Sequence, residues 1–131
     1  MVKGWGNVVS RGLERMKLIK PSNIKKEDRG GYFRKILLDQ KFRKNIKSLG
    51  LLWVKILAKR TSQRHMHKTL YEIFYFLGNG TLGVNGKKYK LKKDYVAVIE
   101  PNEAHWVRAG EKPLELIAIK IPHNREDKIL T

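Results

Sequence analysis

With 131 residues, the chain is long enough for one domain with a buried core, which predicts one site and not several. Hydrophobic residues make up 41% of the chain, as in packed globular proteins, and no apolar run approaches the ~20 residues that a membrane span needs. The absence of cysteine excludes disulfides, thiolate nucleophiles and cysteine metal ligands, so any transition metal must be held by histidine and carboxylate.

The net charge of +17 raises the hypothesis of a nucleic-acid-binding module, because lysine and arginine neutralise phosphates. We disfavour this hypothesis. A lysine-rich surface with only Gln40 and Gln63 as glutamines is also typical of adaptation to high temperature, and net charge acts on solubility and not on fold. The N-terminal stretch has no continuous apolar core of the signal-peptide kind, so we expect a cytoplasmic protein.

Residues 1–31 are the least regular part, and we interpret them as an N-terminal arm that ends in a turn at residues 28–31. Within the arm, residues 16–19 predict a short edge strand, and either Met1 or Met16 can be the natural start. Because a small β-barrel has exposed sheet edges, we expect a homodimer in which the arm pairs with the partner's sheet.

From residue 32 onward, short β-rich runs alternate with turn residues, which predicts an all-β sandwich or barrel over residues 32–122, followed by a polar tail at 123–131. Asn85 and Gly86 predict a two-residue hairpin, since both tolerate positive φ. One short helix is expected at residues 40–49, where Phe42 and Ile46 are four apart. The expected strands are 32–38, 51–59, 70–77, 81–84, 87–91, 95–100, 105–109 and 114–121.

The densest basic run, residues 87–93, can be interpreted as a phosphate-binding track or as a half-buried strand. Tyr89 and Leu91 share one face of such a strand, while the lysines at 88, 90 and 92 share the other. We favour the second interpretation, because a lysine-covered face also protects a sheet edge from aggregation.

Three of the four histidines fall in two short segments and indicate a metal site. Side chains two residues apart in a strand point to the same face, so His65 and His67 can direct two imidazoles at one point. A turn then leads to Glu72, whose carboxylate can reach the same layer, and His105 at the start of a later strand supplies a fourth ligand. The remaining histidine, His123, is expected at the surface.

Residues 51–122 resemble the cupins, metal-binding jelly-roll barrels with a two-part sequence motif. The first part, His-X-His followed after three or four residues by Glu, matches His65, His67 and Glu72, with Gly78 and Gly80 near the usual later glycine. The second part keeps Pro101 and His105 but departs from the family's pattern at Asp94, Glu100, Asn102 and Ala109. The resemblance implies a cupin jelly roll with His65, His67, Glu72 and His105 as metal ligands.

Residues 28–50 show a second resemblance, to the N-terminal arm of the dTDP-sugar epimerases and ketoisomerases, which are cupin-type barrels that generally act by acid–base transfer without a metal. It rests on the residues Asp28, Arg29, Gly30, Gly31, Tyr32, Phe33, Phe42 and Gly50. The two resemblances imply different mechanisms, since this chain keeps every ligand of the metal motif.

Three imidazoles and one carboxylate suit one divalent Fe, Mn, Co, Ni, Zn or Cu ion and leave coordination positions open for a small-molecule ligand. Strand alternation predicts a substrate pocket lined by Gln63, Phe74, Phe76 and Val107. We expect a metal-dependent isomerase or epimerase of sugars or sugar phosphates, or a dioxygenase, with His65, His67 and Glu72 as catalytic candidates. The alternatives are a non-catalytic barrel that binds a sugar or small anion, and a metal-independent nucleotide-sugar enzyme with His65 or His67 as the base.

Overall fold

The computed structural model describes residues 15–31, 33–42, 45–124 and 126–131, and the regular secondary structure in this part of the chain is all β except for one 3-10 turn. One five-stranded antiparallel sheet has the order β1 (Lys17–Ile19), β9 (Val96–Ile99), β6 (Tyr71–Phe76), β11 (Leu114–Ile121) and β4 (Gly50–Ile56). A second has the order β12 (Ile129–Leu130), β5 (His65–Met66), β10 (His105–Ala109), β7 (Gly80–Val84) and β8 (Lys87–Leu91).

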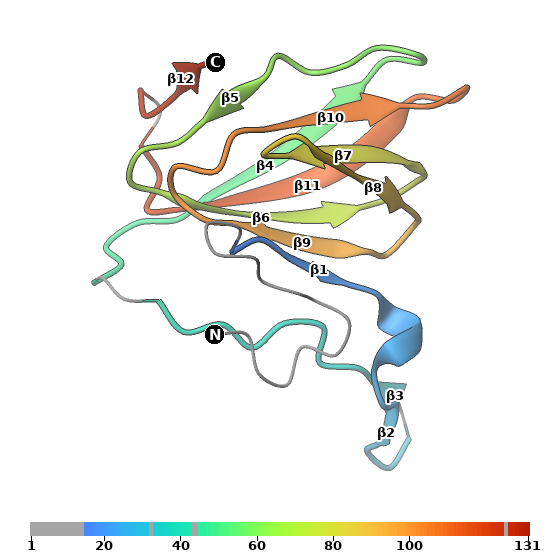
Figure 1. The fold of residues 1–131 in the computed structure, drawn as a ribbon. Helices are drawn as coiled ribbons and strands as arrows, with labels where there is room; N and C mark the ends of the chain where they lie inside the picture. Colours follow the sequence, from blue (N-terminus) through green and yellow to red (C-terminus); the bar gives the residue numbers. More distant parts are fainter. Residues whose placement is uncertain (1–14, 32, 43–44, 125) are drawn as a thin grey trace.

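The two sheets form a sandwich of the cupin jelly-roll kind around one hydrophobic core (Figure 1). Alternate side chains of β6 and β11 point into this core, where Phe74, Phe76 and Leu116 meet Leu82 and Val107 from the facing sheet. The period-two pattern of each strand therefore separates an apolar inner face from an outer one. Strands β10 and β11 have the bounds that the sequence predicted, and β8 does too.

The N-terminal segment covers part of the outer face of the first sheet, over β9 and β6. The edge strand expected at residues 16–19 is confirmed as β1, which pairs with β9. A 3-10 turn (Pro21–Asn23) and a small hairpin, β2 (Glu27–Asp28) and β3 (Phe33–Arg34), follow, and the hairpin projects away from the barrel (Figure 1). Ile24, Leu37 and Leu38 then pack on a smaller apolar cluster that contains Val96 and Val98.

The expected helix at residues 40–49 is wrong for the residues described there, which have no helical structure. Phe42 instead packs its ring against Tyr71, with the ring centroids 4.8 Å apart, while Ile46 is exposed. The spacing of four therefore does not reflect a helical turn, since one side chain packs on Tyr71 and the other is exposed. The strand expected at 32–38 is likewise shortened to β3.

The turn predictions and the lysine-covered strand are confirmed. Asn85 and Gly86 both have positive φ, 49° and 85°, and connect β7 to β8. In β8, Leu91 is buried and Tyr89 half-buried, while Lys88 and Lys90 are exposed. Among the described residues we find no helix with the length and apolar character needed to cross a bilayer.

Candidate metal centre

Three strands, and the residue that follows one of them, bring the four predicted ligands together at one end of the sandwich. Strand β5 pairs with β10 so that His65 lies directly opposite His105. Glu72 is the second residue of β6, and it points inward with Phe74 and Phe76 because all three share the same parity in the strand. One ligand atom from each of His65, His67, Glu72 and His105 can be chosen so that all four lie within 4.8 Å of one another.

The cluster is buried on three sides. His67, Glu72 and His105 are at most 4% exposed, whereas His65 is half-buried and forms the open side. Burial lowers the pKa of His65 to about 4, and the neighbouring His105 and His67 add to this effect against a hydrogen bond to the Gln63 carbonyl. The His65 ring is therefore neutral at pH 7, which a metal ligand requires.

Each imidazole is oriented by a backbone carbonyl at its Nδ1 atom. His65 Nδ1 donates to the Gln63 oxygen at 2.7 Å, and His105 Nδ1 donates to the Glu103 oxygen at 2.8 Å. His67 Nδ1 donates to the carbonyl of Asp127. In the neutral ring, a proton on Nδ1 leaves the lone pair on Nε2, so the three rings present their lone pairs to the centre.

The donor set fits a divalent cation. Glu72 Oε1 lies 3.0 Å from His105 Nε2 and 3.2 Å from His67 Nε2, so lone pairs and an anionic oxygen face each other in a buried space. Two ligands at right angles around an ion at ~2.1 Å are themselves about 3 Å apart, which matches this spacing. Without a cation, the arrangement needs two buried imidazolium ions beside one carboxylate, which carries a large desolvation cost.

Glu72 is a carboxylate at neutral pH. Burial, the largest influence, raises the pKa of this carboxyl, but the contacts with His105 and His67 outweigh it and hold the pKa well below its usual range. If an ion replaces the hydrogens on the Nε2 atoms, as metal binding requires, three neutral imidazoles and one carboxylate would give the cluster a charge of −1, which complements a divalent ion.

The predicted pocket residues divide into two groups. Phe74, Phe76 and Val107 are buried in the core, and the Phe74 ring is 5.9 Å from the His105 ring, so Phe74 forms the apolar floor of the cluster. The Gln63 side chain is exposed, and its described contact with the site is the backbone carbonyl that receives His65. His123 is exposed, as expected.

Sequence analysis missed Lys120. This residue pairs with Glu72 across β11 and β6, and its Nζ atom lies 4.0 Å from Glu72 Oε2. Its side chain is 21% exposed. Strand alternation in the sequence could have predicted this position. Lys120 is an even number of residues from the buried Leu114, Leu116 and Ala118, so its side chain faces inward with theirs.

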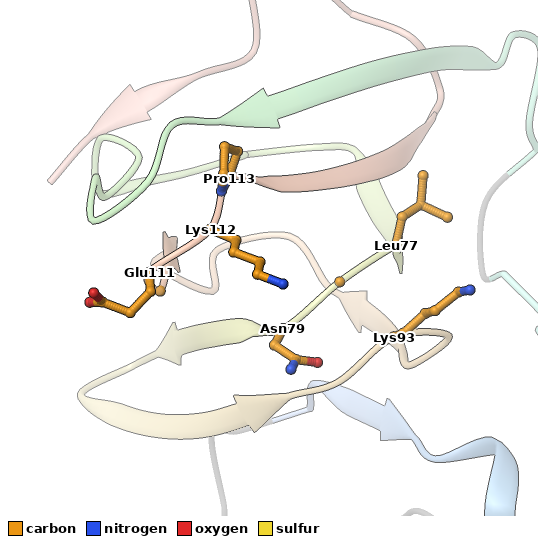
Figure 2. A pocket seen from close by; sticks show the side chains of 8 residues that line it. Leu77, Asn79, Lys93, Glu111, Lys112 and Pro113 are labelled. Carbon is orange, nitrogen blue, oxygen red and sulfur yellow. The ribbon is translucent and has the colours of Figure 1, made fainter.

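A cavity of about 530 Å³ lies at the other end of the sandwich, where Figure 2 shows Lys93, Lys112 and Asn79 around it. The residues that line it lie in the loops that follow β6, β8 and β10, whereas the histidine–glutamate cluster lies where β6 and β10 begin. Five residues of strand separate the two ends, about 16 Å. This cavity is therefore not part of the cluster.

The model is similar to several solved structures. It matches a dTDP sugar isomerase from Desulfovibrio desulfuricans with a TM-score of 0.64 and 13% identity, over 95% of this chain and 88% of the other. A cupin protein from Bacteroides fragilis matches with a TM-score of 0.55 and 20% identity, over 61% of this chain and 70% of the other. A mutant of the salicylate 1,2-dioxygenase from Pseudoaminobacter salicylatoxidans matches with a TM-score of 0.52 and 19% identity, over 56% of this chain but only 20% of the dioxygenase.

At these identities the likeness shows the fold alone. No curated protein sequence matches the chain significantly. The family model described as "Cupin domain" matches residues 52–120, which is more than half of the chain and includes all four residues of the cluster. The chain therefore belongs to the cupin family.

Proposed function

We propose that this cupin is a cytoplasmic enzyme that uses one divalent transition metal to isomerise or epimerise a small molecule of the sugar or sugar-phosphate class. The observation that carries the proposal is the convergence of three imidazoles and one carboxylate on a buried point with one half-open side. The likeness to the dTDP sugar isomerase over nearly the whole chain supports the choice of reaction class.

A bound divalent ion would polarise a carbonyl or hydroxyl oxygen of the substrate and so make the hydrogen on the neighbouring carbon more acidic. The chain's own residues would bind the ion and shape its surroundings. His65, His67, Glu72 and His105 would hold the ion, and Phe74 presents an apolar surface that excludes water from the buried side. The Lys120 ammonium lies beside Glu72 and can attract a phosphate or carboxylate group on the substrate.

A dioxygenase is the second candidate, and the similarity to salicylate 1,2-dioxygenase supports it. The same ligands would serve, so the two candidates differ in the need for oxygen. A metal-independent nucleotide-sugar enzyme has His65 or His67 as the proton acceptor, and the neutral ring of His65 is consistent with that role. A barrel that binds a sugar or small anion without turnover is the non-catalytic alternative.

The deciding experiment is a substrate screen of the protein loaded separately with Fe, Mn, Co, Ni, Zn or Cu, with and without oxygen. The substrates are phosphosugars, nucleotide sugars, enediols and keto acids. Interconversion that requires metal but not oxygen is the expected result. Oxygen-dependent consumption would instead identify a dioxygenase, and turnover by fully metal-stripped protein would overturn the metal-dependent mechanism. Binding of a sugar or anion without turnover would identify the non-catalytic alternative.

Glu72→Gln separates catalysis from binding. The amide keeps the shape of the side chain but removes its negative charge, so the cluster holds a cation less firmly. An enzyme should lose or change its turnover even at saturating metal. A binding protein should lose ligand affinity only in step with its metal content.

A further inference from the structure

Two buried acidic residues flank the candidate metal centre without belonging to it. Glu103 and Asp127 are 1% and 8% exposed, and neither is among the four ligands. The backbone carbonyl of each receives the Nδ1 hydrogen of one ligand histidine, Glu103 from His105 and Asp127 from His67. The ring orientation of two ligands therefore depends on where these two acidic residues are held.

The carboxylate of Asp127 holds the turn that joins His67 to Glu72. Its Oδ1 atom accepts the Lys68 amide at 2.7 Å. Its Oδ2 atom accepts the Thr69 amide at 2.8 Å, the Thr69 hydroxyl at 2.7 Å and the Leu70 amide at 3.1 Å. Burial alone would raise the pKa of the Asp127 carboxyl, but these hydrogen bonds lower it, so the group is charged at neutral pH.

The residues after Asp127 continue along the strand that carries His65. Strand β12 pairs with β5, with Leu130 opposite His65 and Ile129 opposite Met66. The Thr131 amide donates to the Arg64 carbonyl at 3.2 Å. Figure 1 shows this C-terminal segment beside β5. One segment, Asp127 to Thr131, thus contacts the chain on both sides of the paired histidines.

Glu103 holds the N-terminal segment in the same way. Its Oε2 atom accepts the amides of Arg15 at 2.7 Å and Met16 at 3.1 Å, at the start of β1. Its Oε1 atom accepts the Glu100 amide at 2.9 Å, inside the turn that leads to His105. Each buried acid therefore connects a terminal segment to one ligand histidine.

We propose that Asp127 is a positioning residue of the metal centre, that Glu103 is its counterpart for His105, and that docking of the C-terminal segment is coupled to metal binding. The inference rests on the proposed metal function. A carbonyl that fixes the Nδ1 hydrogen directs the Nε2 lone pair at the ion, and loss of such partners typically weakens metal affinity ~10–100-fold. By linkage, a bound ion must stabilise the docked C-terminal segment to the same extent.

The test compares Asp127→Asn with Asp94→Asn in the full chain. An asparagine at 127 removes the charge and puts an NH₂ group against one of the four donors, whereas Asp94 makes its hydrogen bond with Tyr75 near the opposite end of β6. Calorimetric titration with Co²⁺ should give a Kd raised ~10–100-fold for Asp127→Asn and unchanged for Asp94→Asn. In wild type, Zn²⁺ should slow hydrogen exchange at the Thr131 and Leu70 amides.

Ring nitrogen NMR of the metal-free proteins gives a readout that lower stability alone would not change. In wild type, the Nδ1 hydrogens of His67 and His105 should both be protected from exchange with solvent by their carbonyl partners, whether or not Nε2 also carries a hydrogen. Asp127→Asn should lose this protection at His67 and keep it at His105, and Glu103→Gln should show the reverse. If Asp127→Asn does not fold, Thr69→Val removes a single hydrogen bond to Asp127 and should produce the same loss at His67 with a smaller rise in Kd.

A folded Asp127→Asn protein with wild-type Co²⁺ affinity and an unaltered His67 ring would overturn the inference. If only Thr69→Val folds, a Thr69→Val protein with wild-type Co²⁺ affinity and an unaltered His67 ring would also overturn the inference. Wild-type protein that binds neither Co²⁺ nor Zn²⁺ would refute the metal function alone, because the ring signals are measured without metal and still test the positioning.

Discussion

Lys120 lies directly opposite Glu72 in the pairing of β11 with β6, with its ammonium 4.0 Å from the carboxylate oxygen Oε2. A positive charge beside the cluster opposes the binding of a divalent cation. We therefore expect Lys120→Met to tighten Co²⁺ binding by up to about tenfold, as measured by calorimetry at low ionic strength. Lys90→Met, on the exposed face of β8, is the matched control and should have no effect. Co²⁺ binding by Lys120→Met that is weaker than or equal to that of wild type would show that this charge does not oppose cation binding.

Metal content tests the centre itself. Protein purified without a metal-affinity column should carry close to one transition metal per chain by elemental analysis. His65→Ala or His105→Ala should lower this content strongly, because each removes one of four converging ligands. His123→Ala should retain the wild-type content, since His123 is exposed and outside the cluster. Wild-type protein that contains no metal and takes up none of Mn, Fe, Co, Ni, Zn or Cu would refute the assignment.

The close approach of β7 to Trp106 predicts a packing effect. A Cβ atom at Gly83 would lie 2.1 Å from the Trp106 ring, whereas one at Gly110 would meet nothing within 4 Å. Gly83→Ala should therefore lower the free energy of unfolding by about 1–3 kcal/mol, through displacement of the indole from the paired strand. Urea unfolding of Gly83→Ala and Gly110→Ala makes the comparison. Equal stabilities would show that the indole moves without cost.

Tyr75 predicts a dependence of stability on alkaline pH. Its hydroxyl donates to Asp94 at 2.9 Å, and this bond, with burial as the lesser cause, raises the pKa of the phenol. Because the raised pKa belongs to the folded state, the contribution is complete below about pH 10 and disappears as the pH rises through the folded value. Tyr75→Phe should thus cost roughly 0.5–1 kcal/mol at pH 7 and progressively less as the pH rises above about 10. A difference that is constant between pH 7 and 12 would disprove the assignment.

Strand β4 at the edge of the first sheet exposes two large apolar side chains, Leu51 at 69% and Trp53 at 62%. We propose that the protein forms a homodimer and that this face or the N-terminal arm contributes to it. Light scattering at tens of micromolar should give twice the mass of the chain. Leu51→Lys and a protein that begins at Met16 separate the two contributions. A monomeric wild type would reject the dimer, and a dimer that persists in both variants would reject these surfaces.

The histidine–glutamate cluster was predictable because its geometry follows from local rules. Residues two apart in a strand share a face, so the parity of His65 and His67, and that of Glu72 with Phe74, can be read without a structure. The same rule predicted β8, β10 and β11. The same rule places the Lys120 side chain on the inner face of β11. We did not predict its position beside the cluster, because we considered only histidine and carboxylate residues as ligands.

The contacts around the centre were not predictable in this way. Strand β12 has two residues, too few for a periodic pattern, and Asp127 stands in a polar stretch of ordinary tail composition. Its role arises from pairing with residues about 60 positions earlier, which no local pattern records. For Phe42 the local pattern predicted too much. Its spacing of four from Ile46 suggested a helix, but the ring of Phe42 makes a single packing contact with Tyr71.

The path of the chain at its C-terminal end affects how the protein should be handled. Thr131 hydrogen-bonds Arg64, the neighbour of His65, so any peptide that continues beyond Thr131 starts beside the open side of the cluster. A polyhistidine tag fused at that point would offer competing imidazoles to the same ion and strain the short β12 pairing. Metal stoichiometries measured on such a fusion would report the tag together with the cluster, whereas a tag cleaved from the other end of the chain would leave the count undisturbed.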